Sequence, residues 1–287
     1  MAGANSGHNV SMASVLDRGL KVAVGCDFTY TAAAKTPALF LVRPNPAGGG
    51  LAVLEERWTS TPELPFHDYV DLYGNAFRRV TLPPGPSVLR YDATVDTTSL
   101  PDAVDTSAVQ LPVDELPDDV LHYTLPSRYC PSDVLADDAW RLFGNTPPTW
   151  ARVQTIVDYV HEHIRFGYGS STSTTTALDV FQSGTGVCRD YAHLAITFCR
   201  ALNVPARYAF GYLPDIDVPP PDAPMDFCAW FEAYLGDRWW TFDPRNNQRR
   251  IGRVLIARGR DALDVAMVTS YGSAVLERLD VRADKRG

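Results

Sequence analysis

The sequence predicts an α+β fold in which an antiparallel β-sandwich-like domain precedes a domain of helices and strands. Two patterns indicate this order. Short runs of β-branched and aromatic residues recur in the first third of the chain, and segments with helical periodicity begin near residue 131. The length of 287 residues allows two domains. We expect an N-terminal tail over residues 1–19, a β-rich domain with a linker over 20–120, and a second domain over 121–287.

Composition and charge exclude several classes of protein. Apolar residues make up 45% of the chain and charged residues 21%, as in globular proteins. The net charge of −8 predicts no nucleic-acid partner, because such surfaces usually carry a basic excess. No apolar run is long enough to span a membrane, so we expect no membrane partner. Residues 1–21 lack the apolar core of a secretory signal, and the five cysteines form no CxxC pair, which favours a cytoplasmic location.

The first third of the chain is predicted to form strands. Turn clusters such as NPAGGG at residues 45–50 separate the β-rich segments, and this spacing is typical of an antiparallel sandwich or barrel. A stretch rich in Asp, Pro and Thr at residues 96–119 is expected to be a linker. The predicted strands are residues 20–30, 38–43, 51–58, 77–82 and 88–95.

The second part of the chain is predicted to be mostly helical. Thr146 followed by Pro147 is a favourable cap and first turn for one helix. Residues 188–202 are mostly good helix formers and follow a glycine-rich turn. Residues 227–235 and 238–243 predict a hairpin, because Gly-Asp between two apolar runs is a favourable two-residue loop.

Cys188 stands where the glycine-rich turn meets the predicted helix. A thiol at a helix N-terminus is close to unpaired N–H groups and to the positive end of the helix dipole, which favour the thiolate. The same N–H groups could stabilise an oxyanion. The alternative role is a small buried apolar side chain, as for most free cysteines. Cys199, in an apolar run, is expected in the core.

The predicted hairpin brings further reactive side chains together. Counting from a two-residue loop at 236–237 pairs Trp230 with Asp243. Because side chains alternate along a strand, Cys228, Trp230 and Glu232 then share one face with Asp243. Residue 228 is a diagonal neighbour of Asp243 on that face. Cys188 would complete a group of nucleophile, base and orienting acid if its helix end packs against this face.

Three motifs resemble, in order and spacing, those of the bacterial transglutaminase-like superfamily, which includes cysteine proteases with an N-terminal β domain. The resemblance covers about residues 130–270. It implies a papain-like α+β catalytic domain with a Cys–His–Asp triad, in which Cys188 is the nucleophile and Asp243 is the orienting acid. The motifs are GTGVCRDYAHL at 184–194, VPARYAFGY at 204–212, and AWFEAYL at 229–235 together with WWTFDPR at 239–245.

The chain departs from this family at the general base. The family places a histidine directly before Ala-Trp, and this chain has Cys228 there. A thiol with an ordinary pKa of about 8.5 is a poor base at neutral pH beside an imidazole near 6.5. His193 lies about 140° round the helix from Cys188, which favours a supporting role. The residues that we expect to support the site without reacting are Gly186, Asp190, His193, Trp230 and Glu232.

The resemblance implies thiol-dependent acyl chemistry without a cofactor or metal. Cys188 would attack an amide-like or thioester carbonyl of a peptide or small molecule and form a thioester, which water or an amine releases. One alternative is a catalytically silent transglutaminase-like binding module. Another is a redox or zinc site in which Cys188 and Cys228 act together, with Asp243 as a further zinc ligand.

A basic cluster follows the hairpin. We expect it to be a solvated face that balances the acidic remainder of the chain, since a nucleic-acid site is unlikely in an acidic protein. The cluster comprises Arg249, Arg250, Arg253, Arg258 and Arg260.

Overall fold

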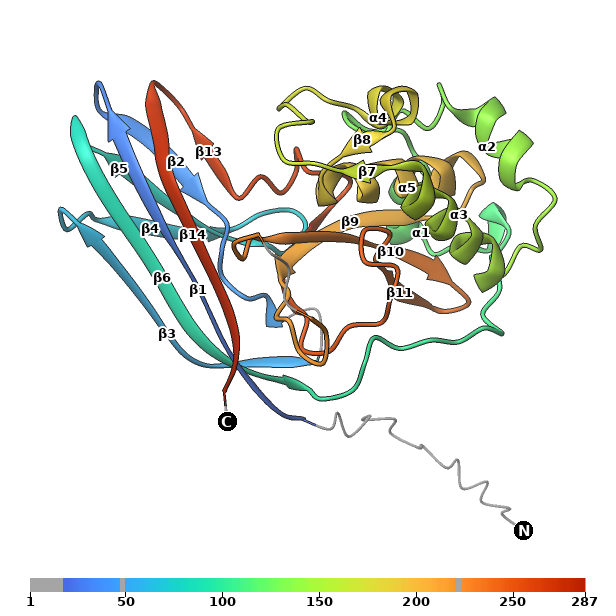
Figure 1. The fold of residues 1–287 in the computed structure, drawn as a ribbon, viewed down its shortest axis with the longest axis horizontal. Helices are drawn as coiled ribbons and strands as arrows, with labels where there is room; N and C mark the ends of the chain where they lie inside the picture. The colour runs from blue at the N-terminus through green and yellow to red at the C-terminus, as the bar shows by residue number, and fades with distance from the viewer. Residues whose placement is uncertain (1–17, 47–49, 220–222, 287) are drawn as a thin grey trace, which may run out of the picture.

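The computed structural model describes residues 18–46, 50–219 and 223–286. Figure 1 shows two regions side by side, long strands on the left and helices around a smaller sheet on the right. We call them the β-sandwich and the α+β region. The mixed fold with mostly antiparallel sheets confirms the predicted fold class. Among the residues described, no helix is both long and apolar enough to cross a membrane.

Two four-stranded antiparallel sheets form the β-sandwich, with strand orders β14-β1-β6-β3 and β13-β2-β5-β4. Their inner faces carry aromatic residues, and the ring of Phe28 in β1 lies 5.4 Å from that of Phe40 in β2 in an edge-to-face contact. The sheets therefore pack face to face. The strands are β1 (Arg18–Ala32), β2 (Thr36–Phe40), β3 (Leu51–Thr61), β4 (Phe66–Val70), β5 (Ala76–Leu82), β6 (Gly85–Thr98), β13 (Val268–Ser270) and β14 (Ala274–Arg286).

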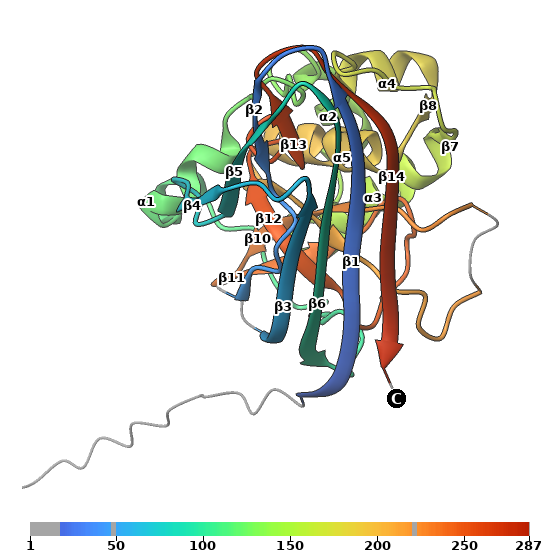
Figure 2. The same cartoon turned by 90° about the vertical axis from the view of Figure 1, so that its left-hand side faces the viewer.

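The C-terminal strands complete the β-sandwich. β14 pairs with β1 along its length, and β13 pairs with β2 (Figure 2). The division expected after residue 120 stays a prediction, but strand pairing does not follow it at the C-terminal end. Without β14, one edge of β1 would expose a row of unpaired backbone groups. The expected tail over residues 1–19 lies outside the described residues as far as residue 17, and β1 already begins at Arg18.

The α+β region is built on one antiparallel sheet with the strand order β11-β10-β9-β12, and α5 lies against β9 and β10. A short parallel pair, β7 with β8, lies beside it. The strands are β7 (Arg165–Phe166), β8 (Thr185–Gly186), β9 (Ala206–Tyr212), β10 (Cys228–Leu235), β11 (Arg238–Phe242) and β12 (Val254–Gly259). The helices are η2 (Val113–Glu115), α1 (Asp118–Leu121), η3 (His122–Thr124), α2 (Ala136–Phe143), α3 (Trp150–His163), α4 (Ala177–Ser183) and α5 (Cys188–Ala201).

The start of α3 differs from the sequence prediction. The side chain of Thr149, not that of Thr146, accepts the N–H of Ala151 at 3.3 Å and caps the helix. The Thr146 hydroxyl instead donates to the carbonyl of Phe143 at 2.5 Å, where α2 ends. The prediction that Thr146 caps α3 was wrong, because its hydroxyl donates to a carbonyl at the C-terminal end of α2.

One apolar core runs through both regions, and polar contacts across their boundary are buried. The hydroxyl of Tyr212 in β9 donates to the carbonyl of Val42 at 2.9 Å. The side chain of Asn75 binds the backbone of Arg258 in both directions, donating to its carbonyl at 2.8 Å and accepting its N–H at 3.0 Å. The β-sandwich therefore holds a fixed position against the sheet that carries Cys228.

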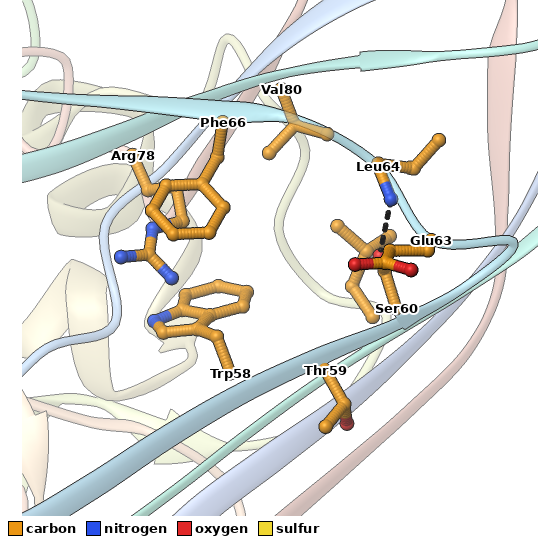
Figure 3. Close-up of a pocket in the computed structure, with 9 residues that line it drawn as sticks. Trp58, Thr59, Ser60, Glu63, Leu64, Phe66, Arg78 and Val80 are labelled. Atoms are coloured by element: carbon orange, nitrogen blue, oxygen red, sulfur yellow. Dashed lines mark hydrogen bonds between the residues drawn. The ribbon is translucent and has the colours of Figure 1, made fainter.

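A cavity of about 270 Å³ opens within the β-sandwich (Figure 3). The guanidinium of Arg78 lies between two rings, 3.5 Å from the centroid of Phe66 and 4.8 Å from that of Trp58. The N–H of Leu64 donates to the hydroxyl of Ser60 at 2.9 Å on the opposite side. The residues lining this cavity belong to β3–β6 and their connections, so it is separate from the cavity that contains Cys188.

Candidate active site

The N-terminus of α5 is fixed by Asp190. Its Oδ2 accepts the N–H of Val187 at 2.8 Å, and its Oδ1 accepts the hydroxyl of Ser171 at 3.1 Å. A Cβ added at Gly186 would lie 2.8 Å from the Cβ of Asp190, so only glycine allows this approach without displacement. Gly186 and Asp190 thus set the position at which the helix begins, and Cys188 is its first residue.

The thiol of Cys188 is half-buried beside the start of β10. Its Sγ lies 3.9 Å from the carbonyl oxygen of Phe227. Burial raises the pKa of Cys188 to about 11, and the charge of Asp226 adds to this increase, whereas a backbone hydrogen bond from Ala229 opposes it. The expected thiolate is therefore not favoured, because loss of solvation outweighs the helix terminus. The raised pKa favours the neutral thiol of Cys188 at neutral pH.

Cys188 and Cys228 line one cavity of about 390 Å³, which we call the nucleophile cavity. The rings of Phe166 and Tyr168 form one part of its wall. The polar side chains that line it include those of Asp226, Arg245, Asn246, Gln248 and Arg250. Two thiols, the carboxyl groups of Asp215 and Asp226 and apolar surface therefore meet in one space of a size suited to a peptide segment or a small molecule.

Cys228 is the first residue of β10, and the predicted hairpin register is confirmed. Leu235 pairs with Arg238 and Glu232 with Thr241. Burial raises the pKa of Cys228 well above its usual value, and the charges of Asp243 and Cys188 raise it further. Cys188 and Cys228 are both free thiols. Within the described ranges no three His, Cys, Asp or Glu side chains are placed to hold a metal ion, so the zinc alternative finds no ligand set.

Asp243 follows β11 directly and is buried, but its partners differ from those that the family resemblance implies. Its Oδ1 accepts the N–H of Asn246 at 3.0 Å, and its Oδ2 accepts the Asn246 side-chain amide at 2.8 Å. Nη2 of Arg253 donates to the same Oδ2 at 3.1 Å. Arg253 also forms an ion pair with Asp102 at 2.9 Å. A guanidinium thus pairs with the carboxylate that, by the resemblance, would orient an imidazole.

Trp230 and Glu232 are not brought into the nucleophile cavity. They lie on the face of β10 that packs toward the β-sandwich, where Glu232 pairs with Arg207 at 2.6 Å and Arg258 at 2.7 Å. Burial raises the pKa of Glu232, but the two guanidinium groups more than offset this and lower it overall. Glu232 is an anion in a buried ion-pair network.

His193 is fully buried and supports the backbone. Its Nε2 accepts the N–H of Ala262 at 3.1 Å, and its ring stacks on that of Tyr129 at 5.2 Å. Burial lowers its pKa well below the usual value, so the ring is neutral. The described residues that line the nucleophile cavity include no histidine. His161 and His163 bind the carbonyls of Pro244 and Phe181.

The expectation of a solvated basic face was wrong for three of the five arginines. Arg250 is buried and pairs with Asp215 at 2.9 Å. Arg253 and Arg258 pair with the buried carboxylates described above. An arginine can be an exposed surface charge or can form a buried, two-pronged ion pair with a carboxylate. The sequence does not show which carboxylates pack against these arginines in the fold.

Asp226 and Arg253 are among the residues near Cys188 and Asp243 that the sequence analysis did not assign to the site. Asp226 lies two positions before Cys228, so the two side chains would point to the same face if the extended backbone of β10 continued to residue 226. This spacing could have identified Asp226 from the sequence. Arg253 is the residue directly before β12, and only the tertiary fold brings it to Asp243.

A thiol at a helix N-terminus, beside an antiparallel sheet that carries the partner residues, defines the class of papain-like thiol enzymes. Comparisons with known proteins identify the family. Residues 140–244 match the model of the transglutaminase-like superfamily. The structure is similar to that of a candidate cysteine protease from Cytophaga hutchinsonii, with a TM-score of 0.83 and 32% identity over 93% of this chain and 90% of the other. The chain belongs to the transglutaminase-like superfamily.

Two mycobacterial proteins are also similar in sequence. An uncharacterized protein of Mycobacterium leprae is 27% identical over 228 residues, which cover 75% of this chain and 78% of the relative. An uncharacterized protein of Mycobacterium tuberculosis is 28% identical over 164 residues, which cover 53% of this chain and 52% of that relative. The match thus spans about half the length of the second relative.

Proposed function

We propose that this protein is an enzyme that cleaves or transfers acyl groups at an amide-like or thioester bond, with Cys188 as the nucleophile and Asp226 as the group that exchanges its proton. The family supports thiol-dependent amide chemistry in general. The proposal that Asp226 exchanges a proton with Cys188 rests on one observation, namely that both residues line the nucleophile cavity. The substrate class is a peptide or small-molecule amide or thioester, and no cofactor takes part.

Asp226 has two properties that suit a proton acceptor. Burial raises the pKa of its carboxyl group above the usual value, which makes the carboxylate a stronger base. Its charge raises the pKa of Cys188, so the carboxylate and the thiol lie close enough to interact. Oδ1 of Asp226 accepts the N–H of Phe227 at 2.7 Å, and we assign the proton transfer to Oδ2.

The reaction begins with attack of the Cys188 sulfur on the substrate carbonyl while Asp226 accepts the thiol proton. The carbon–oxygen double bond opens, and N–H groups of the first turn of α5 stabilise the resulting oxyanion. The carbonyl re-forms as the leaving amine or thiol departs with the proton from Asp226, which leaves a thioester on Cys188. Water or an amine then loses a proton to Asp226, attacks the thioester and releases Cys188, which recovers that proton.

A catalytically silent binding module is the second candidate. The raised pKa of Cys188 favours it, because a neutral thiol is a weak nucleophile. The pairing of Asp243 with Arg253 favours it too, since that carboxylate has no imidazole to orient. Under this candidate the nucleophile cavity binds a ligand without turnover, so loss of the thiol changes no rate.

The test is hydrolysis of peptide anilides and aryl thioesters by the full chain and by Cys188→Ala. We expect turnover that Cys188→Ala abolishes and Cys199→Ala retains, because Cys199 is a core thiol in the middle of α5. Adding glycinamide as an acceptor separates hydrolysis from transfer, since only transfer yields the amide product. Equal rates for the full chain and Cys188→Ala would establish the silent module.

The role of Asp226 is tested separately with Asp226→Asn and Asp226→Glu. We expect Asp226→Asn to lower kcat/KM for anilides by about 10²-fold or more, the usual contribution of a general base. Asp226→Glu keeps the carboxyl group and should retain a pH profile with an acidic limb that Asp226→Asn lacks. An unchanged pH profile in Asp226→Asn would remove Asp226 from the mechanism and leave Cys188 untouched.

A further inference from the structure

A second large cavity, of about 540 Å³, lies between the sheet of the α+β region and the β-sandwich. We call it the arginine cavity. The ends of β3 and β6 contribute Leu51 and Thr97 to its wall. Its other walls come from β9–β12, the loop before β12 and the segment after β6. They carry two carboxylates, Asp102 and Glu232, and five arginines, Arg207, Arg238, Arg250, Arg253 and Arg258.

Three of these guanidinium groups lie over indole rings. Arg207 lies 4.0 Å above the ring centroid of Trp239, Arg238 lies 4.3 Å above that of Trp240, and Arg253 lies 4.5 Å above that of Trp230. A guanidinium stacked on a ring directs its N–H groups sideways, in its own plane. The ring contacts limit the movement of the three guanidinium groups before any ligand binds, which reduces the entropy lost on binding.

Two buried donors of the cavity wall lack partners. In the part of the chain that the structure describes, Nε of Arg250 and Nη1 of Arg253 are buried and have no hydrogen-bond partner. The side chains of Arg250 and Arg253 are only 5% and 8% exposed. Leaving a buried charged donor unsatisfied is costly, so almost all such groups in proteins bind an acceptor. Both side chains line the arginine cavity, so an acceptor of a ligand bound there would reach these donors after a small rearrangement of the two side chains.

The charges on the wall indicate the chemistry of that ligand. Five guanidinium groups face two carboxylates inside the cavity, although Asp215 and Asp243 pair with Arg250 and Arg253 from beyond its wall. Arginine binds carboxylate and phosphate groups through two parallel N–H bonds, and such charge-assisted bonds are short and strong. We propose that the arginine cavity is a binding site for a small oxyanion, a carboxylate or a phosphate, that Arg238, Arg250 and Arg253 hold.

This inference is independent of the proposed function, because binding requires neither Cys188 nor Asp226. Arg253 links the two sites, since it also holds Asp243. The test is isothermal titration of the full chain with inorganic phosphate and, separately, with succinate, in chloride buffer of constant ionic strength. We expect saturable binding of at least one anion with about one site per chain, and the anion that binds tells phosphate from carboxylate.

Two variants locate the binding in the arginine cavity. Arg238→Gln removes an exposed donor at the rim, and Arg253→Gln removes a buried one. Each should weaken binding by about tenfold or more, as expected for loss of a charge-assisted hydrogen bond. Arg141→Gln, an exposed arginine on α2, is the matched control and should bind as the unchanged chain does. The proposal would be overturned if neither anion showed saturable binding, or if every variant that folds kept its affinity. Water would then be the partner of the unpaired donors of Arg250 and Arg253.

Discussion

Nη2 of Arg253 lies 3.1 Å from Oδ2 of Asp243, and this ion pair occupies the place where the family resemblance implies a carboxylate bound to an imidazole. Burial lowers the pKa of Arg253, but its carboxylate partners Asp102 and Asp243 raise it above the usual value overall. The carboxylate of Asp243 therefore has a guanidinium partner where the resemblance implies an imidazole. Under the proposed function, Cys188 keeps the position at the helix N-terminus that the resemblance assigns to the nucleophile, and Cys228 stands where the resemblance implies the histidine base.

Restoring the missing base should raise activity. Cys228→His places an imidazole at the first position of β10, beside both Cys188 and Asp243. We expect kcat/KM for a peptide anilide to rise by about 10²-fold or more, the usual contribution of a general base. Cys228→Ser is the matched control, since it removes the same thiol without adding a base. A rate for Cys228→His no higher than that for Cys228→Ser would mean that the site lacks more than its base.

Alkylation of Cys188 should report its raised pKa. Because only the thiolate reacts, a pKa of about 11 predicts slow reaction with iodoacetamide at pH 7, on the order of a hundredfold slower than free cysteine. The rate should rise about tenfold per pH unit between pH 7 and 10. Peptide mass spectrometry measures the rate at Cys188, and Cys188→Ala identifies the site. A rate that is constant above pH 7 would show a preformed thiolate and contradict the neutral resting thiol.

His193 should make stability depend on pH. Burial lowers its folded-state pKa well below 6.5, so the unfolded chain binds a proton first as the pH falls. The stability that the neutral ring contributes is present above pH 6.5 and is lost below it, with a slope approaching about 1.4 kcal/mol per pH unit. His193→Gln keeps an acceptor for Ala262 but cannot titrate.

The measurement for His193 is the difference in unfolding free energy between pH 8 and pH 5 for both chains. We expect His193→Gln to be less stable at pH 8, because it loses the stacking on Tyr129, and to lose less stability on acidification. Equal losses in the two chains would assign the acid sensitivity to the carboxylates.

Glu232 should matter for stability more than any exposed carboxylate. Glu232→Gln leaves Arg207 and Arg258 buried without their shared counter-charge, which costs about 3–5 kcal/mol in comparable buried pairs. Asp138→Asn breaks an exposed ion pair with Arg141 and should cost less than about 1 kcal/mol. Urea unfolding measures both. Similar small losses would mean that the arginine cavity is well enough hydrated to screen its charges.

Local sequence signals predicted the hairpin well and the helix cap poorly. The Gly-Asp loop sets the register of β10 and β11 by itself, so counting along the chain placed Glu232 opposite Thr241. Thr146 and Thr149 are both favourable caps, and the choice between them depends on the end of α2. Local interactions therefore determine the hairpin register, but they do not determine which threonine caps α3.

The pairing of strands far apart in the chain could not be predicted from the sequence. Nothing in residues 274–286 indicates that they pair with β1, since their alternating pattern fits any exposed sheet edge. The same holds for the site. The position of Cys188 at the helix start followed from the glycines before it, but the loss of solvation that raises its pKa comes from segments that fold over it. Arg253 reaches Asp243 only through the fold of the loop that precedes β12.

In the proposed reaction, the sulfur of Cys188 carries the acyl group. The most direct measurement is the intact mass of the chain after rapid acid quenching of its reaction with an aryl thioester, followed by peptide mapping. We expect a single acyl adduct on Cys188 that is absent in Cys188→Ala and decays with added amine. No adduct, or an adduct on Cys228 instead, would contradict it.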